Sequence, residues 1–261
     1  MAENTESMKP ETPGSELSEA EISDTDLSGE DLPRTELPGP ELSGLGSCGI
    51  VINLKDYRDA YHYFAAAGKV YDRLNRIYES VLDHAEFYRI TADIVRKEFK
   101  HIRISSNPGH VRRHFAGAQS GGFPCSPASP LSGCQKVYLI CVPAGAGLER
   151  MLNVFLDSAV HRGFLAEGYY CPTKPEARLM HLIIPDLGVG FITCERHQAI
   201  PKPALKAGAE VVTVDLKHAF QDERIAQGEK KLRIKKKLMD ELLDKGFRYL
   251  RRAMAGSRNS S

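Results

Sequence analysis

The sequence predicts an α/β protein in which helices flank a sheet. Between residues 135 and 218, short apolar runs alternate with turns and an amphipathic helical segment, which is typical of buried strands in an α/β domain. The chain has 261 residues, 42% of them hydrophobic, so it is long enough to bury one sizeable core. It contains no run of about 18 apolar residues and no signal-peptide pattern, so we expect a cytoplasmic protein without a membrane-spanning helix.

Residues 1–47 differ from the rest of the chain in composition. They contain twelve Asp or Glu residues, two Lys or Arg residues and no aromatic residue, which gives a local net charge of −10. Apolar residues recur at every fifth position from Leu17 to Leu42, but these six pentads are too few to stabilise a solenoid. We therefore predict that this segment is a disordered acidic tail. Its candidate binding partner is an unknown protein. Because the whole chain has a net charge of +1, the remaining residues carry +11, which predicts a basic surface.

Residues 48–104 are predicted to be helical. The apolar residues follow spacings of three and four, which places one stripe on a helix: Tyr71, Leu74, Ile77, Tyr78, Val81 and Leu82. A break near Asp83–His84 would divide the segment into two helices. Residues 105–134 are rich in Gly, Pro and Ser and predict an irregular connection, with a short strand expected near 114–118.

The segment 135–218 is predicted to form the α/β domain. Its expected strands are the apolar runs at 136–142, 165–171, 181–185, 189–194 and 210–214. A helix is expected at 148–161, and Gly188 predicts a tight hairpin between two of the strands. Residues 219–261 are predicted to form a basic C-terminal helix and tail, with an apolar stripe between Met239 and Met254.

The strongest functional signal is a strand, a glycine turn and a helix in succession: KVYLICV, PAGAG and LERMLNVFLDSAV. In a P-loop, G-x-x-x-x-G-K-[ST], backbone N–H groups and the helix N-terminus hold phosphate oxygens, the Lys contacts the β- and γ-phosphates, and the hydroxyl holds Mg²⁺. On this template the candidate nucleotide-binding residues are Ala144, Gly145, Ala146, Gly147, Leu148, Glu149 and Arg150. Leu148 stands at the lysine position and Glu149 at the hydroxyl position, so catalysis is expected to be lost or weak. An ordinary turn between a strand and a helix would need the same glycines.

Four stretches of the chain carry a resemblance to a known family: VYDRLNRIYESVLDHAEF, RRHFAGAQSGG, KVYLICVPAGAG and YYCPTKPEARLMHLIIPDLGVGFIT. Residues 56–216 resemble the helical linker and second half of a bacterial family of P-loop nucleotide kinases/ATPases that has two tandem P-loop halves. The resemblance implies a P-loop NTPase-like three-layer sheet with flanking helices, and ATP or GTP with Mg²⁺ as the candidate cofactor. The chain departs from the family at the loop lysine and hydroxyl, so the resemblance supports fold and ancestry more than activity.

Two aspartates are candidates for the Walker B residue, which ends an apolar strand and helps to hold Mg²⁺. The run LIIPD ends in Asp186, and the run VVTVD ends in Asp215. Either residue also fits an aspartate that accepts hydrogen bonds in a turn after a strand. Arg112, Arg113 and Arg150 are the candidate cations that could replace the missing lysine.

No metal site is predicted. The six cysteines are irregularly spaced and are expected to be thiols rather than disulfides: Cys48, Cys125, Cys134, Cys141, Cys171 and Cys194. Cys194 and His197 have the spacing of half a zinc site, and Cys171 and His181 are further candidates, but zinc needs four ligands in matched pairs. Buried thiols and turn histidines are the expected interpretation.

The leading prediction is a P-loop NTPase-fold protein that binds a nucleotide or a phosphate group. One alternative is a non-catalytic protein–protein interaction module. Another is nucleic-acid binding through the basic run KKLRIKKK at Lys230–Lys237. That run also fits the solvated face of a core helix, and it lacks the aromatic residues that stack on single-stranded bases. No membrane partner is expected.

Overall fold

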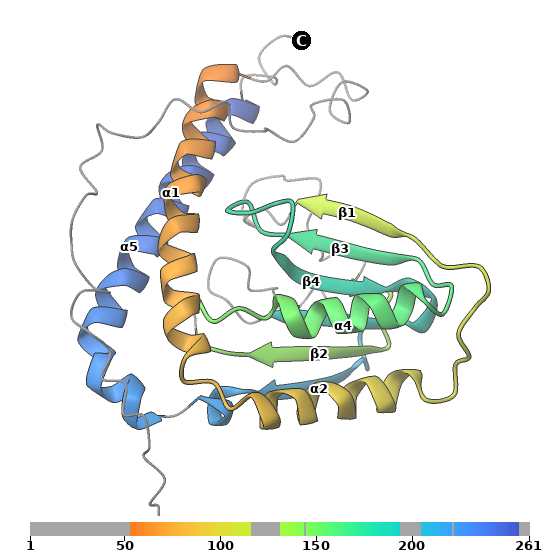
Figure 1. Ribbon diagram of the computed structural model, residues 1–261. Coiled ribbons are helices and arrows are strands. Elements are labelled where there is room, and N and C mark those ends of the chain that lie inside the picture. Colours follow the sequence, from red (N-terminus) through yellow and green to blue (C-terminus); the bar gives the residue numbers. More distant parts are fainter. Residues whose placement is uncertain (1–52, 116–130, 144, 194–204, 221, 256–261) are drawn as a thin grey trace, which may run out of the picture. The chain divides into compact units, whose positions relative to one another are not determined.

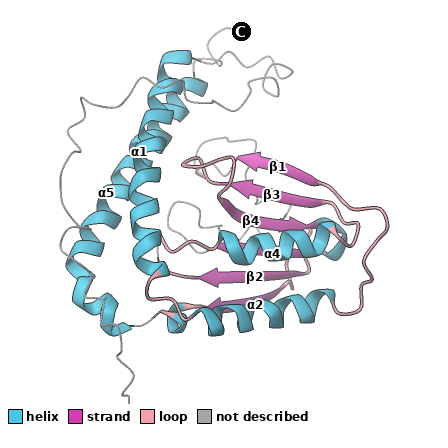
Figure 2. Ribbon diagram, in the orientation of Figure 1, coloured by secondary structure: helices cyan, strands magenta, loops and turns pink. Residues whose placement is uncertain are grey.

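The computed structural model describes residues 53–115, 131–143, 145–193, 205–220 and 222–255. These residues form a six-stranded mixed sheet with flanking helices (Figures 1 and 2). The predicted acidic tail lies outside the described residues. No helix among the described residues is both long enough and apolar enough to cross a membrane.

The strand order in the sheet is β1-β3-β4-β5-β2-β6. The strands are β1 (Val111–Phe115), β2 (Lys136–Cys141), β3 (Ala166–Tyr170), β4 (Leu179–Ile184), β5 (Val189–Thr193) and β6 (Glu210–Asp215). Only β4 runs antiparallel to its neighbours, so the carboxyl ends of the other strands meet at one edge of the sheet. That edge is where ligands bind in open α/β sheets.

The hairpin predicted at Gly188 is confirmed. The 3₁₀ turn η4 (Pro185–Leu187) follows β4, and Gly188 then adopts φ 60°, a left-handed conformation that glycine enters without steric cost. Its N–H donates to Pro185 O at 2.9 Å, and the chain reverses so that β5 pairs antiparallel with β4. The strand before this turn begins at Leu179, two residues earlier than expected.

The helices begin and end close to the predicted positions. They are α1 (Leu54–Glu79), α2 (His84–Phe99), α4 (Glu149–Val160) and α5 (Asp222–Ala255). The predicted break separates α1 from α2, where the Asp83 side chain caps α2 by accepting the Glu86 N–H at 3.0 Å. The short strand expected near 114–118 is β1, which begins at Val111 because its residues pair in register with β3 from Ala166 onward.

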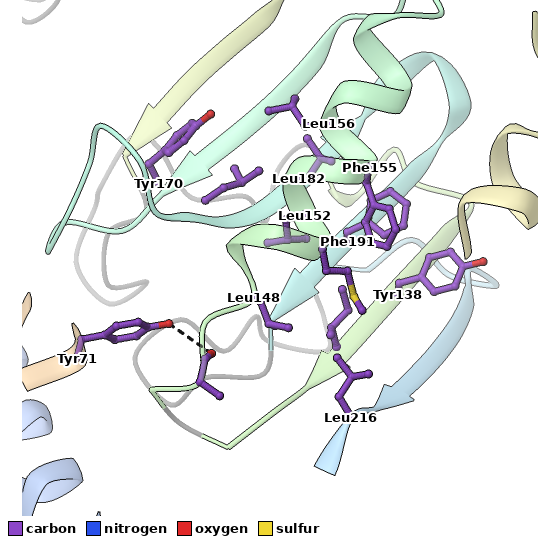
Figure 3. Packing of buried hydrophobic residues seen from close by; sticks show 14 of the residues in the cluster. Tyr71, Tyr138, Leu148, Leu152, Phe155, Leu156, Tyr170, Leu182, Phe191 and Leu216 are labelled. Atoms are coloured by element: carbon purple, nitrogen blue, oxygen red, sulfur yellow. Dashed lines mark hydrogen bonds between the residues drawn. The ribbon is translucent and has the colours of Figure 1, made fainter. Parts of the chain in front are cut away.

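Helices α2 and α4 cover one face of the sheet (Figure 1). On this face Phe155 of α4 stacks on Phe191 of β5 at 4.5 Å, and Tyr138 of β2 stacks on Phe191 at 5.2 Å (Figure 3). Leu131 and Cys134 pack on the opposite face, in a second cluster that includes residues of β2, β3, β4 and β5. Burial on both faces explains why these strands read as continuous apolar runs.

Helices α1 and α5 pack against each other along their lengths. Phe64 of α1 meets Phe247 of α5 edge to face at 5.0 Å, and Tyr63 stacks on Tyr249 at 5.4 Å. A Cβ atom at Gly246 would lie 2.6 Å from Cε1 of Phe64, so the glycine lets the two helices approach closely. The apolar stripes of both helices are therefore buried against each other rather than against the sheet alone.

We predict that Phe64→Ala lowers the free energy of unfolding by about 3–5 kcal/mol, because the phenyl ring is fully buried and its removal leaves a cavity. Urea unfolding followed by circular dichroism would measure the change. Ile104→Ala is the control, since this side chain is 74% exposed and its loss should change stability by less than about 0.5 kcal/mol. Equal effects of the two substitutions would contradict the packing described here.

Candidate functional site

The glycine turn lies between β2 and α4, at the carboxyl edge of the sheet. Gly145 has φ 88°, which favours glycine, and the Ala146 N–H donates to Pro143 O at 2.9 Å. Helix α4 begins at Glu149 with Leu148 as its N-cap, and no side chain caps it. Ala144 lies outside the described residues. The turn therefore has the strand–glycine–helix arrangement that the sequence predicts.

Helix α1 covers this turn directly. The Asn75 side chain accepts the Gly147 N–H through Oδ1 at 2.7 Å. The Tyr71 hydroxyl donates to Ala146 O at 3.5 Å, a contact that Figure 3 shows. A Cβ atom at Gly145 would lie 2.9 Å from the Leu74 side chain. Side chains of α1 thus take the backbone donor and the adjacent space that a phosphate group would use in a P-loop.

Two side-chain oxygens lie over Gly147. A Cβ atom at this glycine would be 2.6 Å from Glu149 Oε2 and 2.7 Å from Asn75 Oδ1. Both oxygens occupy the position above the helix N-terminus, where the positive end of the helix dipole favours acceptors and negative charge. The glycine is needed here because the chain's own acceptors approach its backbone.

A buried arginine joins α1, α4 and the sheet beside the turn. Arg178 precedes β4 and is only 2% exposed. Its Nε donates to Glu149 Oε1 at 2.9 Å, its Nη2 donates to Asp72 Oδ1 at 2.5 Å, and its Nη1 donates to the Thr173 hydroxyl. The guanidinium also lies 3.8 Å from the centre of the Tyr71 ring. All three nitrogen atoms of this buried charge therefore have acceptors.

The charge on Arg178 is maintained in this setting. Burial alone lowers the pKa of the guanidinium, but its neighbours outweigh burial and raise the pKa above its usual value: Tyr71, Cys171, Glu149 and Asp72. One guanidinium faces the two carboxylates of Asp72 and Glu149, so this cluster carries a net charge of −1. An anion bound at the turn would therefore be repelled by this net negative charge.

The candidate loop cations are used elsewhere. Arg150 pairs with Glu79 of α1 at 2.7 Å between Nη1 and Oε1, and Leu148, at the lysine position, is buried in the main core. Arg112 pairs with Glu167 at 2.9 Å, and Arg113 donates to the backbone oxygens of the segment after β3. Both of these arginines lie on β1, four strand spacings from β2, which is roughly 19 Å. Neither could replace the loop lysine.

The two Walker B candidates lie at opposite ends of the strands that form the sheet. Asp186 follows β4, the antiparallel strand. Two residues later, the Gly188 O accepts the Lys136 N–H at the start of β2 at 3.1 Å. Asp186 is therefore at the far edge from the turn and cannot hold a metal ion there. Asp215 pairs in register with Cys141 and lies at the same edge as the turn. Its Oδ1 accepts the Lys217 N–H at 3.0 Å, as in a turn after a strand.

The histidine and cysteine candidates do not assemble a metal site among the described residues. His181 is 1% exposed, its Nδ1 accepts the Thr193 N–H at 3.2 Å, and burial lowers its pKa to about 3. Cys171 contacts the Thr173 hydroxyl at 3.1 Å. The described cysteines are thiols rather than disulfides, as expected: Cys134, Cys141 and Cys171. Cys194 and His197 lie outside the described residues.

Comparison with models of protein families, with curated protein sequences and with solved structures gives no match.

Sequence reasoning did not find Asn75, Asp72 or Arg178 as site residues. The two α1 residues lie among other polar residues of an amphipathic helix, and neither is distinctive by type. Arg178 carries a weak signal, because it is a lone cation directly before a fully buried apolar strand. A buried charge needs a partner, so that position alone predicts an ion pair but not its location.

We predict that Arg178→Met lowers the free energy of unfolding by about 2–3 kcal/mol. Removing one partner of a buried ion pair costs about 3–5 kcal/mol, and the half-exposed Asp72 reduces that figure because water can solvate its carboxylate. Urea unfolding would measure the change. The control is Arg89→Met on the exposed face of α2, whose pairs with Glu86 and Asp93 are solvent-exposed, so its loss should change stability by less than about 1 kcal/mol. An equal loss in both variants would contradict a special role for Arg178.

We predict that His181 makes the protein less stable in acid. Its folded-state pKa of about 3 lies below its ordinary value of 6.5, so the unfolded chain binds the proton first and stability falls as pH drops below about 6.5. At about 1.36 kcal/mol per pH unit, the loss between pH 7 and pH 5 should be about 2 kcal/mol. Urea unfolding of the parent and of His181→Asn at both pH values should show a flatter response in the variant. Parallel curves would refute this assignment.

Proposed function

We propose that this chain is a P-loop-type α/β protein that has lost nucleotide turnover and acts as a non-catalytic interaction module. The strand–glycine–helix unit and its parallel neighbours β5 and β6 support the P-loop-type ancestry, together with the family resemblance of residues 56–216. The observation that carries the functional proposal is the hydrogen bond from Gly147 N–H to Asn75 Oδ1 at 2.7 Å. The donor that should bind a phosphate oxygen instead holds helix α1.

Electrostatics at the turn favours the interaction module over a nucleotide-binding protein. The dipole of α4 would contribute about 0.3–1 kcal/mol toward binding an anion. A unit negative charge about 4 Å from a carboxylate is opposed by about 4 kcal/mol at an effective dielectric constant of about 20. Asp72 and Glu149 share one guanidinium, and Arg150 is paired with Glu79, so the pairs beside the turn supply no excess positive charge. Repulsion therefore exceeds the dipole term.

The contact surface of the module is the pair of helices α1 and α5. Helix α5 spans 34 residues, and only one stripe of it is buried. Its exposed cations include Lys230, Lys231, Arg233 and Lys237. A long helix with one stripe buried leaves a broad polar surface on which a partner can dock.

We predict that the parent protein binds neither Mg²⁺–ATP nor Mg²⁺–GTP with a Kd below about 1 mM, which corresponds to about −4.1 kcal/mol. Calorimetric titration would measure binding, and release of inorganic phosphate would measure turnover. The expected result is no heat of binding and no hydrolysis above a Gly147→Pro control, which lacks the backbone donor. If the parent binds a nucleotide and Gly147→Pro abolishes that binding, the protein is a nucleotide-binding protein and the interaction-module proposal is wrong.

The double substitution Leu148→Lys with Glu149→Ser distinguishes a latent nucleotide-binding site from a turn that has only a structural role. In a latent site the restored lysine and hydroxyl should strengthen Mg²⁺–ATP binding at least about tenfold, because a charge-assisted contact contributes about 1.5–3 kcal/mol. In the structural turn, Asn75 still occupies the Gly147 donor and the serine no longer pairs with Arg178. The proposal expects no gain in affinity and a lower melting temperature. A tenfold gain contradicts it.

A further inference from the structure

Strand β6 forms one edge of the sheet and is exposed to solvent. It pairs with β2 on one side, and among the described residues no strand pairs with its other side. Its residues Val211, Thr213 and Asp215 are exposed, and Val211 keeps 45% of its surface in contact with solvent. Just before the strand, a Cβ atom at Gly208 would meet nothing within 4 Å. The outer side of β6 is therefore open to a partner.

The backbone groups of β6 alternate between β2 and the open side. The Glu210 N–H donates to Gln135 O at 2.8 Å, and the Leu216 N–H donates to Cys141 O at 2.9 Å. Because the register is continuous between these two bonds, the even-numbered residues of β6 direct their backbone groups toward β2. The odd-numbered residues direct their N–H and C=O groups outward: Val211, Thr213 and Asp215. This row of donors and acceptors can serve as a template for a further strand.

The opposite edge of the sheet is protected in a way that β6 is not. Strand β1 carries Arg112 and Arg113, and charged side chains within an edge strand disfavour pairing with another chain. Both arginines are also bonded within the protomer, to Glu167 and to the backbone oxygens after β3. In β6 the charged residues stand only at the two ends, and the residues between them are VVTV. Such β-branched residues favour strand pairing.

One antiparallel register satisfies every outward group of β6 with a second β6. Two residues directly opposite each other in an antiparallel pair can exchange both of their backbone hydrogen bonds. A two-fold axis perpendicular to the sheet, placed between two copies of Thr213, sets Thr213 opposite itself and Val211 opposite Asp215 twice. A shift by two residues in either direction would place one outward residue of each copy opposite a residue outside the strand. The backbone thus selects a register centred on Thr213.

The same register suits the side chains. Asp215 lies opposite Val211, and Glu210 lies opposite Leu216, so no carboxylate directly faces another, an arrangement that would be destabilising. The side chains that pack against the main core continue across the interface as β-branched pairs, which stabilise antiparallel strands: Val212 opposite Val214, twice.

We propose that β6 pairs antiparallel with β6 of a second copy of this chain, centred on Thr213, and joins two six-stranded sheets into one. This interface is separate from the α1–α5 surface and goes beyond the proposed function. It closes as a two-fold dimer, since the arginines of β1 disfavour further pairing at the other edge. A second β6 matches the first in length and in every outward group, which an extended segment of another protein need not do.

Sedimentation velocity of the full chain tests the dimer. The expected result is a monomer–dimer equilibrium that shifts toward the dimer as concentration rises, with no larger species. A protein that stays monomeric up to about 100 μM, the range of a weak specific complex, overturns the inference. A series of larger oligomers overturns it as well, because a two-fold interface closes on itself.

Substitution of Thr213 tests the register. In Thr213→Lys and in Thr213→Glu, the residue at the axis faces a like charge, so the dimer Kd should rise at least about tenfold. An equimolar mixture of the two variants should form a heterodimer, because the facing charges are then opposite. Ile104→Lys adds the same charge at an exposed position outside the sheet and should leave the dimer intact. Unchanged dimers in the Thr213 variants, or a mixture that stays monomeric, would refute this register.

Amide hydrogen exchange locates the interface. In the dimer, exchange should slow at the outward amides: Val211, Thr213 and Asp215. In monomeric Thr213→Lys those amides should exchange fast, whereas the even-numbered amides stay protected by β2 in both states. A dimer without slowed exchange at the outward amides lies on another surface, which overturns the proposal. If a charged variant does not fold, Thr213→Pro replaces it, because proline removes only the outward N–H and is tolerated there in edge strands.

Discussion

The buried guanidinium of Arg178 is the constraint on which the turn, α1 and α4 depend. A charge that is only 2% exposed must be compensated inside the protein, and here the compensation comes from Asp72 of α1 and Glu149 of α4. Because the two carboxylates come from different helices, satisfying one guanidinium fixes both helices relative to the start of β4. The stacked Tyr71 ring holds the same group from its face.

This constraint changes the role of the glycine turn. In a P-loop the turn leaves its backbone donors open to a phosphate, whereas here Asn75 accepts from Gly147 and Tyr71 donates to Ala146 O. The same backbone geometry that favours an anion also favours an amide or carboxylate oxygen of the protein itself. In this protein the turn is thus a joint between helix α1 and the sheet, with Leu148 and Glu149 directly after its last glycine.

The contact between α1 and the turn also determines which groove lies on the protein surface. By docking at the turn, α1 brings its partner α5 to the carboxyl edge of the sheet, where Tyr78, Pro143 and Phe220 contribute to the groove beside α5. Charged residues of both signs line this groove along α5, and the anion Glu229 lies one helical turn before Arg233.

Much of the fold could be predicted because it depends on local patterns. The apolar run of β2, the amphipathic periodicity of α4, the cap at Asp83 and the left-handed Gly188 all act through neighbours within a few residues, so the sequence alone determined them. The glycines of the turn were identified for the same reason. Strand order was not, and it is strand order that places Asp215 beside the turn and Asp186 at the opposite edge.

The contacts that define the site were decided only by the tertiary structure. Gly147 and Asn75 are 72 positions apart, and Arg178 and Asp72 are 106 positions apart. Neither residue type nor spacing indicates which donor will meet which acceptor over such separations. A hydrogen bond acts only over about 3.5 Å or less, so its partners are set by how helices and strands pack. The sequence by itself determined that this turn would suit an oxygen acceptor, and the packing of α1 determined that the acceptor is Asn75.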